Sequence, residues 1–282
     1  MKSRPVTLDD RGWRKHLPAN VYLAIHGWSF KGATRLRRQL GLQPRDVEKL
    51  VSAYACAFTR PDSTFLDVGA QHGRHVRAVL ESGPITANVV AFEANPSLAL
   101  KFKDNFAEAI ASSRLRVVNA AVADEPGTAE FFVNTFDSGY SGLVRRNIAE
   151  TRDAYSQCTV ARISIDGFSR DLEKKVSCIK IDVEGAEFAV LKGAERTLSE
   201  SQPIVLFECA SNAAPFYGHG LPEVVLWLNE RGFAIATIDG QRISRDEAQG
   251  LFDSRSCCDF VAYPEERGFA VVEQLKRHGR VT

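Results

Sequence analysis

The chain has 282 residues, of which 44% are hydrophobic and 25% are charged. This composition is ordinary for a globular protein, and the length suits one α/β domain with an appendage, or at most two domains. The longest apolar runs, such as residues 204–207, are far shorter than the roughly 20 residues that a membrane span needs. The N-terminus lacks the apolar segment of a signal peptide, so we expect a cytoplasmic protein.

The net charge of +1 conceals an uneven distribution. Residues 1–60 hold twelve Lys or Arg and four Asp or Glu, a charge of +8, so the rest carries 24 basic and 31 acidic residues, a charge of −7. We favour a solvated helical surface for this segment; the alternative is peripheral contact with an anionic partner such as a phospholipid membrane surface. No aromatic residues alternate with the basic residues at 35–38, so a nucleic-acid partner is not expected.

Residues 1–60 are predicted to form a basic N-terminal region of helices and turns, followed by the main domain over residues 61–282. Within this region Asp46 is a candidate N-cap. Val47, Leu50, Val51 and Tyr54 follow at spacings of three and four, which predicts a helix with one apolar face.

From residue 63 the pattern changes to short apolar runs that alternate with amphipathic segments. Strands are predicted at 64–70, 88–94, 115–123, 161–168, 176–185, 203–210, 233–239 and 258–264, the last of which closes the sheet. Helices are predicted at 75–82, 97–112, 186–201 and 221–232, with an added antiparallel strand at 128–135 and a polar stretch at 136–158. Continuously apolar strands that alternate with helices are typical of a mostly parallel α/β sheet.

A glycine-containing turn, residues 67–73, follows the first strand, where open parallel sheets bind ligands. Gly69 permits a tight turn, Gly73 permits close backbone approach at a helix start, and Asp67 would project into the crevice. The spacing differs from that of dinucleotide sites, and the P-loop lysine is absent. The turn alone therefore does not identify a cofactor.

Glu93 ends the second predicted strand, 20 residues after Gly73. An acidic side chain at this position can accept hydrogen bonds from both hydroxyls of a ribose. A lone Glu at a strand end is usually a solvated charge, but its combination with the preceding turn favours a ribose site.

Carboxylates cluster after the central predicted strand, which leads through Lys180 into Asp182, Glu184 and Glu187. Glu184 and Glu187 could simply complement the dipole of the following helix. This does not explain Asp182, because burying a carboxylate at a strand end without a ligand is costly. Glu208 ends the neighbouring strand and joins the cluster.

The segments DVGAQHG, FEANPS, IKIDVEGAE and PIVLFE, in this order and at these separations, resemble the FkbM-type methyltransferases, which use S-adenosylmethionine. The similarity spans about residues 63–212, and IKIDVEGAE is its most specific part. Gln71 stands where the family usually has Asn, and Ala94-Asn95 replaces a Pro-containing turn. The resemblance implies an α/β fold, a Rossmann-like class I methyltransferase sandwich whose mostly parallel seven-stranded sheet has helices on both faces, preceded here by the N-terminal helical region.

The resemblance also implies site residues. The first turn would hold the methionine part of the cofactor and Glu93 the ribose, the adenine would lie after the third strand, and Asp182 would face the sulfonium and the acceptor. The implied cofactor-binding residues are Asp67, Gly69, Ala70, Gln71, Gly73, Glu93, Ala94, Asn95, Asn119, Ala120 and Asp182. The candidate catalytic residues are Asp182, Glu184, Glu208 and His219.

Family members mostly methylate hydroxyl groups, so the resemblance implies O-methylation of a sugar, glycan or natural-product acceptor. Positioning supplies most of the rate of such a transfer, and Asp182 could add general-base help. His219 is a second candidate base.

The acidic cluster could instead hold a Mg²⁺, which we do not favour. No metal site is expected from the six cysteines, which lack zinc spacing. Residues 136–158 are predicted to form part of the acceptor wall.

Two alternatives belong to other classes. A non-catalytic module that binds S-adenosylmethionine would be expected to have lost Asp67, Glu93 or Asp182, all of which are present. A nicotinamide-dependent oxidoreductase would share the ribose carboxylate, but the glycine spacing and the absence of a suitably placed Tyr-x-x-x-Lys pair disfavour it. No feature of the sequence predicts an oligomeric state.

Overall fold

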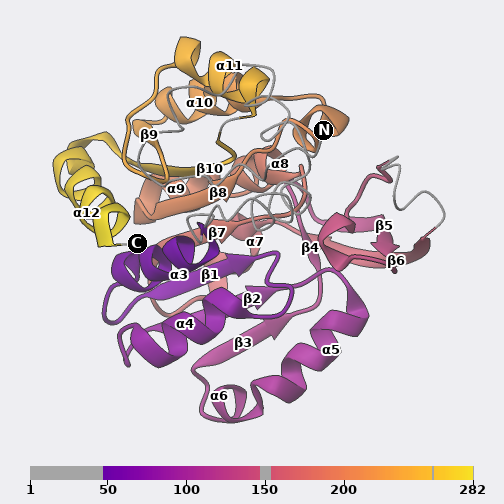
Figure 1. The fold of residues 1–282 in the computed structure, drawn as a ribbon. Coiled ribbons are helices and arrows are strands. Elements are labelled where there is room, and N and C mark those ends of the chain that lie inside the picture. Colours follow the sequence, from indigo (N-terminus) through magenta and orange to yellow (C-terminus); the bar gives the residue numbers. More distant parts are fainter. Residues whose placement is uncertain (1–46, 147–153, 256, 282) are drawn as a thin grey trace, which may run out of the picture.

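The computed structural model describes residues 47–146, 154–255 and 257–281, and its centre is a seven-stranded sheet in the order β3-β2-β1-β7-β8-β10-β9 (Figure 1). The parallel strands are β1 (Thr64–Val68), β2 (Asn88–Phe92), β3 (Leu115–Val118), β7 (Val176–Ile181) and β8 (Ile204–Glu208). β10 (Asp259–Pro264) is antiparallel to both of its neighbours, β8 and β9 (Phe233–Thr237). The predicted mostly parallel seven-stranded sheet is confirmed.

Helices cover both faces of this sheet, as predicted. One face carries α3 (Val47–Phe58), α4 (Arg74–Ser82), α5 (Pro96–Asn105), α6 (Ala107–Ala111) and α12 (Gly268–Val281). The other carries α7 (Ile165–Phe168), α8 (Glu187–Lys192), α9 (Glu195–Ser201), α10 (Leu221–Asn229) and α11 (Arg245–Ser254). Because each face is covered, β1 and β7 are buried at every position, which explains their continuous apolar sequences.

Two of the predicted helices are each divided into two, and the helices α11 and α12 were not predicted. The expected helix over 97–112 is α5 and α6, joined at Phe106, and the one over 186–201 breaks at Gly193, where a Cβ would lie 2.1 Å from the Ala123 carbonyl oxygen. α11 has Ala248 as its buried residue, so its periodicity is weak; its detectable signal is the capping box formed by Ser244 and Glu247. α12 was also missed.

A second, three-stranded sheet projects to one side of the main sheet (Figure 1). It consists of β4 (Ala121–Val122), β5 (Gly127–Asn134) and β6 (Tyr155–Ile163), in the order β4-β6-β5, with β5 antiparallel to β6. The predicted antiparallel strand at 128–135 is confirmed. The predicted strand at 161–168 is wrong beyond Ile163, because the Ser164 side chain accepts from the Gly167 amide and caps the short helix α7.

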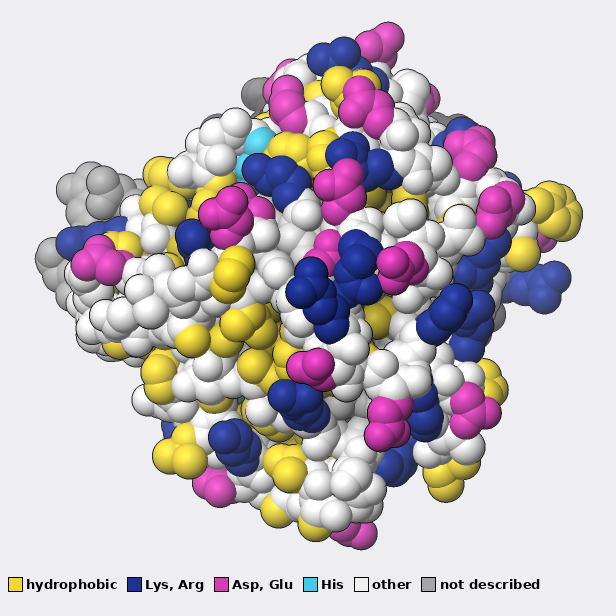
Figure 2. Space-filling view, turned by 180° about the vertical axis from the view of Figure 1, so that it is seen from behind, with side chains coloured by type: hydrophobic (Ala, Val, Ile, Leu, Met, Phe, Trp, Pro, Cys, Tyr) yellow, Lys and Arg dark blue, Asp and Glu magenta, His cyan; other side chains and the backbone are white. Residues whose placement is uncertain are grey.

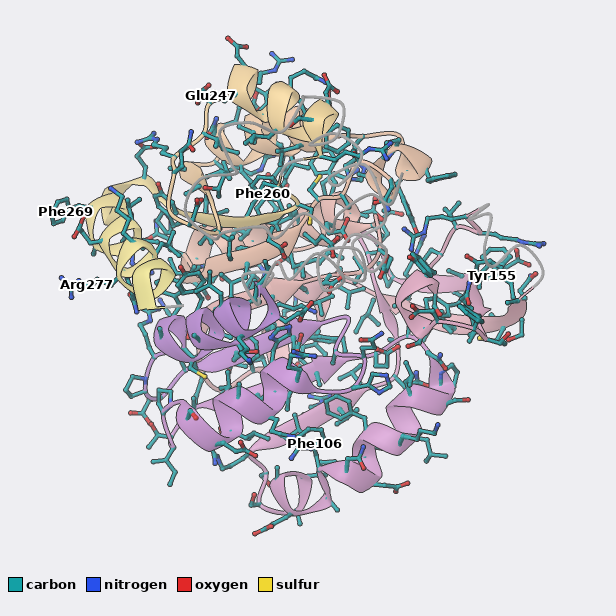
Figure 3. The ribbon with its side chains drawn as sticks, in the orientation of Figure 1. Phe106, Tyr155, Glu247, Phe260, Phe269 and Arg277 are labelled. Atoms are coloured by element: carbon teal, nitrogen blue, oxygen red, sulfur yellow. The ribbon has the colours of Figure 1, made fainter. Side chains whose placement is uncertain are left out.

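The position of the last strand also differs from the prediction. β10 does not close the sheet at its edge but lies between β8 and β9, so the edge strand is β9. Phe260, labelled in Figure 3, is fully buried in the sheet as a result.

The predicted amphipathic helix after Asp46 is α3, and its face of Leu50, Val51 and Tyr54 is buried against the main sheet. The Tyr54 hydroxyl donates to the carbonyl oxygens of Leu275 at 2.8 Å and Ile238 at 3.0 Å, so α3 is joined to α12 and to the end of β9. Residues 1–46, which hold most of the basic segment, lie outside the described residues.

The surface carries charges of both signs. Viewed from behind, Lys and Arg side chains gather near the middle of the molecule, with Asp and Glu side chains close beside them (Figure 2). Several surface charges are paired, as in Arg231 with Glu195 at 2.7 Å. Among the helices that the structure describes, none combines the length and the apolar character needed to cross a bilayer.

We predict that Tyr54→Phe lowers the free energy of unfolding by about 1–2 kcal/mol, because two buried carbonyl groups lose their shared donor. Urea-induced unfolding measures this. Tyr263→Phe is the matched control: Tyr263 is equally buried, but its hydroxyl has no hydrogen-bond partner within the described residues, so a smaller change is expected. Equal effects of the two substitutions would contradict the role of the Tyr54 hydroxyl.

Candidate active site

A cavity of about 720 Å³, including its opening to solvent, lies beyond the carboxyl ends of β1, β2 and β7. β1 and β7 are the parallel neighbours at which the strand order reverses: β2 and β3 follow on one side of β1, and β8 follows on the far side of β7. This is the usual place for a ligand in such sheets. The predicted site residues that line it are Gly69, Gln71, Glu93, Ala94, Asn95, Ala120, Asp182 and Glu184. Those that do not line it are Asp67, Ala70, Gly73, Asn119, Glu208 and His219.

The turn after β1 packs directly against the end of β7. Gly69 has φ +82°, and a Cβ built on it would lie 1.8 Å from the Asp182 carbonyl oxygen. The amides of Gly69 and Ala70 both donate to the Phe92 carbonyl at 3.0 Å, and the Asp182 amide donates to Val68 at 3.0 Å. Position 69 therefore requires glycine for both its conformation and its space.

Gly73 lies at a helix start, as predicted, but does not line the cavity. It lies at the start of α4 with φ +75°, and an added Cβ would be 2.6 Å from the Phe106 ring. Figure 3 labels Phe106, at the junction of α5 and α6; Arg77 of α4 lies over its ring at 4.9 Å. Gly73 therefore makes room for helix packing next to the cavity.

Glu93 is 6% exposed and lines the cavity wall. One carboxylate oxygen accepts from the Gln71 amide and the other from the Asn95 amide, both at 2.8 Å. Burial raises its pKa, while these two backbone hydrogen bonds act in the opposite direction. Asn119 does not line the cavity; its side-chain amide donates to the Glu93 carbonyl at 2.8 Å and so holds the wall in place.

Lys180 is a central residue of the site that the sequence analysis did not single out. Its side chain is 7% exposed, and its Nζ lies 3.3 Å from Asp182 Oδ2, 3.6 Å from Asp67 Oδ1 and 3.2 Å from the Gly69 carbonyl oxygen. Burial lowers its pKa, but the charges of Asp182 and Asp67 outweigh burial and raise it. A lysine inside an otherwise apolar strand was the available signal.

Glu184 lines the cavity and pairs with a residue of the segment between β5 and β6. The Arg146 guanidinium, which is 2% exposed, lies 2.7 Å from Glu184 Oε2, and the Tyr155 hydroxyl (Figure 3) donates to the Arg146 carbonyl. Glu184 has φ +58°. Burial and the charge of Asp182 raise the pKa of Glu184 to about 8, against the opposing effect of Arg146.

Glu187 is a buried structural carboxyl group. It is 1% exposed, and its Oε1 accepts from the amides of Val183 and Gly185 at 3.0 Å. Burial raises its pKa to about 7. Glu187 therefore orders the loop that carries Asp182 and Glu184, in agreement with the helix-start interpretation of its position.

A second cavity, of about 310 Å³ including its opening, lies on the other side of Asp182. Its polar lining residues are Glu48, His75, Lys180, Asp182, Glu208 and Asp259. Glu208 and Asp259 are register partners on β8 and β10. Burial, with the charge of Asp182, raises the pKa of Glu208 well above its usual value and that of Asp259 to about 7. Asp182 lines both cavities.

His219 lies outside both cavities. It follows the short helix η4 (Ala214–Tyr217), and its ring centroid is 5.3 Å from that of Phe188. Burial lowers its pKa. The neighbouring Tyr217 contributes more to the site, because its hydroxyl accepts from the Val144 amide at 3.2 Å and its ring packs on Gly185.

The polar stretch predicted as an acceptor wall contributes Ser138, Gly139, Ser141 and Leu143 to the first cavity, and the Gln71 side chain donates to Ser138 at 3.0 Å. Residues 147–153 of this stretch lie outside the described residues. Within the described ranges, no group of three or more His, Cys, Asp or Glu residues is arranged to hold a metal ion.

The sequence model of the family described as "Methyltransferase FkbM domain" matches residues 67–235, which are more than half of the chain. The chain therefore belongs to the FkbM methyltransferase family, and the resemblance of its motifs is confirmed.

Individual relatives are more distant. The 2-O-methyltransferase NoeI of Sinorhizobium fredii is 26% identical over 155 residues, which cover 51% of this chain and 62% of that protein. The crystal structure of Methyltransferase FkbM from Methylobacillus flagellatus KT has 17% identity and a TM-score of 0.47, covering 75% of this chain and 50% of that one. A SAM dependent methyltransferase from Aquifex aeolicus has 12% identity and a TM-score of 0.41, covering 77% and 88%. The chain thus spans less than two thirds of the first two proteins.

We predict that Glu93→Ala weakens binding of S-adenosylmethionine by roughly 1–3 kcal/mol, because the ribose hydroxyls lose their acceptor. Calorimetric titration measures the dissociation constant. Glu93→Gln keeps one acceptor for the two backbone amides and separates loss of the charge from loosening of the turn. Glu130→Gln, on the exposed part of β5, is the matched control and should bind normally. An unchanged constant in a folded Glu93→Ala variant would remove Glu93 from the site.

Glu187 predicts a pH dependence of stability. Its pKa is about 7 in the folded protein against 4.5 ordinarily. Between these values the unfolded chain releases the proton while the folded protein keeps it, so the free energy of unfolding falls as the pH rises and levels off above 7. Glu187→Gln cannot ionise, so we expect its stability to fall less between about pH 5 and about pH 7.5, by roughly 1–3 kcal/mol. Urea-induced unfolding at several pH values checks this, and identical profiles would refute it.

Proposed function

We propose that the chain is an S-adenosylmethionine-dependent methyltransferase that methylates a hydroxyl group of a small-molecule or glycan acceptor. The observation that carries this proposal is the position of Asp182, which ends the central strand and lines both cavities. A methyl donor in the first cavity and an acceptor in the second would meet at this carboxylate. Such a meeting point is the main requirement for transfer, because positioning supplies most of the rate.

The first cavity has features that suit the cofactor. Glu93 presents carboxylate oxygens for the ribose, and Leu98, Val122 and Phe131 give an apolar wall for the adenine. The glycine at position 69 leaves the turn after β1 free of a side chain at its contact with Asp182. S-adenosylmethionine would supply an activated methyl group there, and these side chains would bind and orient it.

The second cavity supports a neutral, hydroxyl-rich acceptor. Glu208 and Asp259 are adjacent carboxyl groups that can form hydrogen bonds with ring hydroxyls. The lining lysine, Lys180, is already paired with Asp67 and Asp182, so it offers little attraction to the phosphate of a phosphorylated compound. Asp182 would accept the proton of the acceptor hydroxyl as its oxygen takes the methyl group. Glu184 and Glu208 would assist by orientation. The position of His219 gives no support to a role as base.

Membership of the FkbM family supports methyl transfer over the nicotinamide-dependent alternative. The NoeI relative is named a 2-O-methyltransferase, which agrees with a hydroxyl acceptor. A binding module without catalysis would retain the first cavity but would have no use for a second cavity that shares Asp182.

The proposed function is tested by incubating the protein with S-adenosylmethionine carrying a radiolabelled methyl group and three sets of acceptors. These are neutral methyl glycosides, the matching sugar phosphates and glycosides with an amino group. We expect label to transfer to neutral glycosides and not to the phosphates. Transfer to nitrogen alone, or preferential transfer to phosphates, would contradict the proposal.

On the acceptor so identified, Asp182→Asn should lower turnover by about 10²-fold or more, since shape is kept but the proton acceptor is lost. Its affinity for S-adenosylmethionine should change far less. Glu208→Gln is the comparison variant. Glu208 lines the second cavity but not the first, so its substitution should raise the KM for the acceptor. Loss of wild-type activity in EDTA, restored by Mg²⁺, would assign Asp182 to a metal instead. Near wild-type turnover of Asp182→Asn would exclude both roles.

A further inference from the structure

Asp67 is a fully buried carboxyl group near the end of β1. It is 0% exposed and lines neither cavity, so it has no direct contact with a ligand in either. Within the part of the chain that the structure describes, neither of its oxygens has a hydrogen-bond partner. Its one short polar contact is with Lys180, 3.6 Å from Oδ1. A fully buried carboxylate without hydrogen-bond partners lowers the stability of the fold. Its presence therefore calls for a functional explanation.

Lys180 joins this hidden charge to the cavity. Asp67 and Lys180 are register partners on β1 and β7, so their side chains lie on the same side of the sheet. The same ammonium group also contacts Asp182 and the carbonyl oxygen of Gly69, two residues that do line the cavity. Three strand-end groups thus converge on one cation.

We propose that Lys180 is a positioning residue that makes Asp67, Lys180 and Asp182 a single unit of net charge −1, through which Asp67 acts on the cofactor without touching it. This inference rests on the proposed function. S-adenosylmethionine carries a sulfonium charge that its demethylated product, S-adenosylhomocysteine, lacks. A net negative unit therefore favours the methyl donor over the product and helps product release after transfer.

Other charges surround the unit. Glu48 and His75 face it from α3 and α4, and Glu208 and Asp259 from β8 and β10. Glu184 faces it from the loop after β7, and Glu187 from the first position of α8. These groups are the same in all variants below, so comparing variants at one pH isolates the contribution of Asp67 and Lys180.

The test is the ratio of two dissociation constants, for S-adenosylhomocysteine and for S-adenosylmethionine, measured by calorimetry. Asp67→Asn changes the net charge of the unit from −1 to 0, so we expect the preference for S-adenosylmethionine to fall by about threefold to tenfold. The double variant Asp67→Asn with Lys180→Met restores −1, and its ratio should return to within about twofold of wild type. A merely structural defect would weaken both ligands equally and leave the ratio unchanged.

Stability gives a second measurement that needs no ligand. Lys180→Met alone leaves the buried carboxylate of Asp67 and the partly exposed carboxylate of Asp182 without their cation, so it should unfold at a lower urea concentration than the double variant. The inference is overturned if Asp67→Asn leaves the ratio unchanged, or if the double variant is no more stable than Lys180→Met. Failure of the wild-type protein to bind either nucleoside would instead overturn the proposed function. Comparing the urea concentrations at which Lys180→Met and the double variant unfold would still decide whether Asp67 and Lys180 act together.

Discussion

A backbone contact between the turn after β1 and the end of β7 determines the geometry of the whole site. No side chain fits at position 69, because its Cβ would overlap the Asp182 carbonyl group. The same turn is bonded to the end of β2 through the Phe92 carbonyl and the Glu93 carboxylate. Three strand ends are thus held together by main-chain atoms, and the side chains that follow them converge as a consequence. Glu93 and Asp182 face one cavity for this reason.

The convergence brings together more carboxyl groups than cations. Glu184, Glu187, Glu208 and Asp259 all have raised pKa values, and burial is the largest cause for each of them. Such a concentration of buried acids weakens the fold above the pH at which they ionise. The apolar sheet beneath, whose central strands are fully covered on both faces, offsets this cost. A ligand that brings hydroxyl donors or a positive charge would relieve it further.

The sequence predicted those parts of the molecule that depend on local pattern. Continuous apolar runs identified the central strands, and the order of the motifs identified the family. The prediction failed where a tertiary contact decides the outcome. Nothing near Asp67 in the sequence indicates that a lysine 113 positions later, at 180, lies opposite it, because that pairing depends on the strand order. Likewise, Ser164 ended a strand that its apolar neighbours favoured, and β10 entered the sheet between two earlier strands.

The segment between β5 and β6 is attached to a site that is otherwise built on strand ends. Three contacts join it to three different loops: Ser138 with Gln71 after β1, Arg146 with Glu184 after β7, and Val144 with Tyr217 after β8. Each of these loops lies at the carboxyl edge of the main sheet, and two of the three contacts depend on side chains of the segment, those of Ser138 and Arg146. The segment therefore lines the first cavity together with the residues that follow the strand ends. Arg146 illustrates the coupling, because its buried guanidinium donates to the carboxyl group of Glu184, whose pKa is in turn raised by the charge of Asp182.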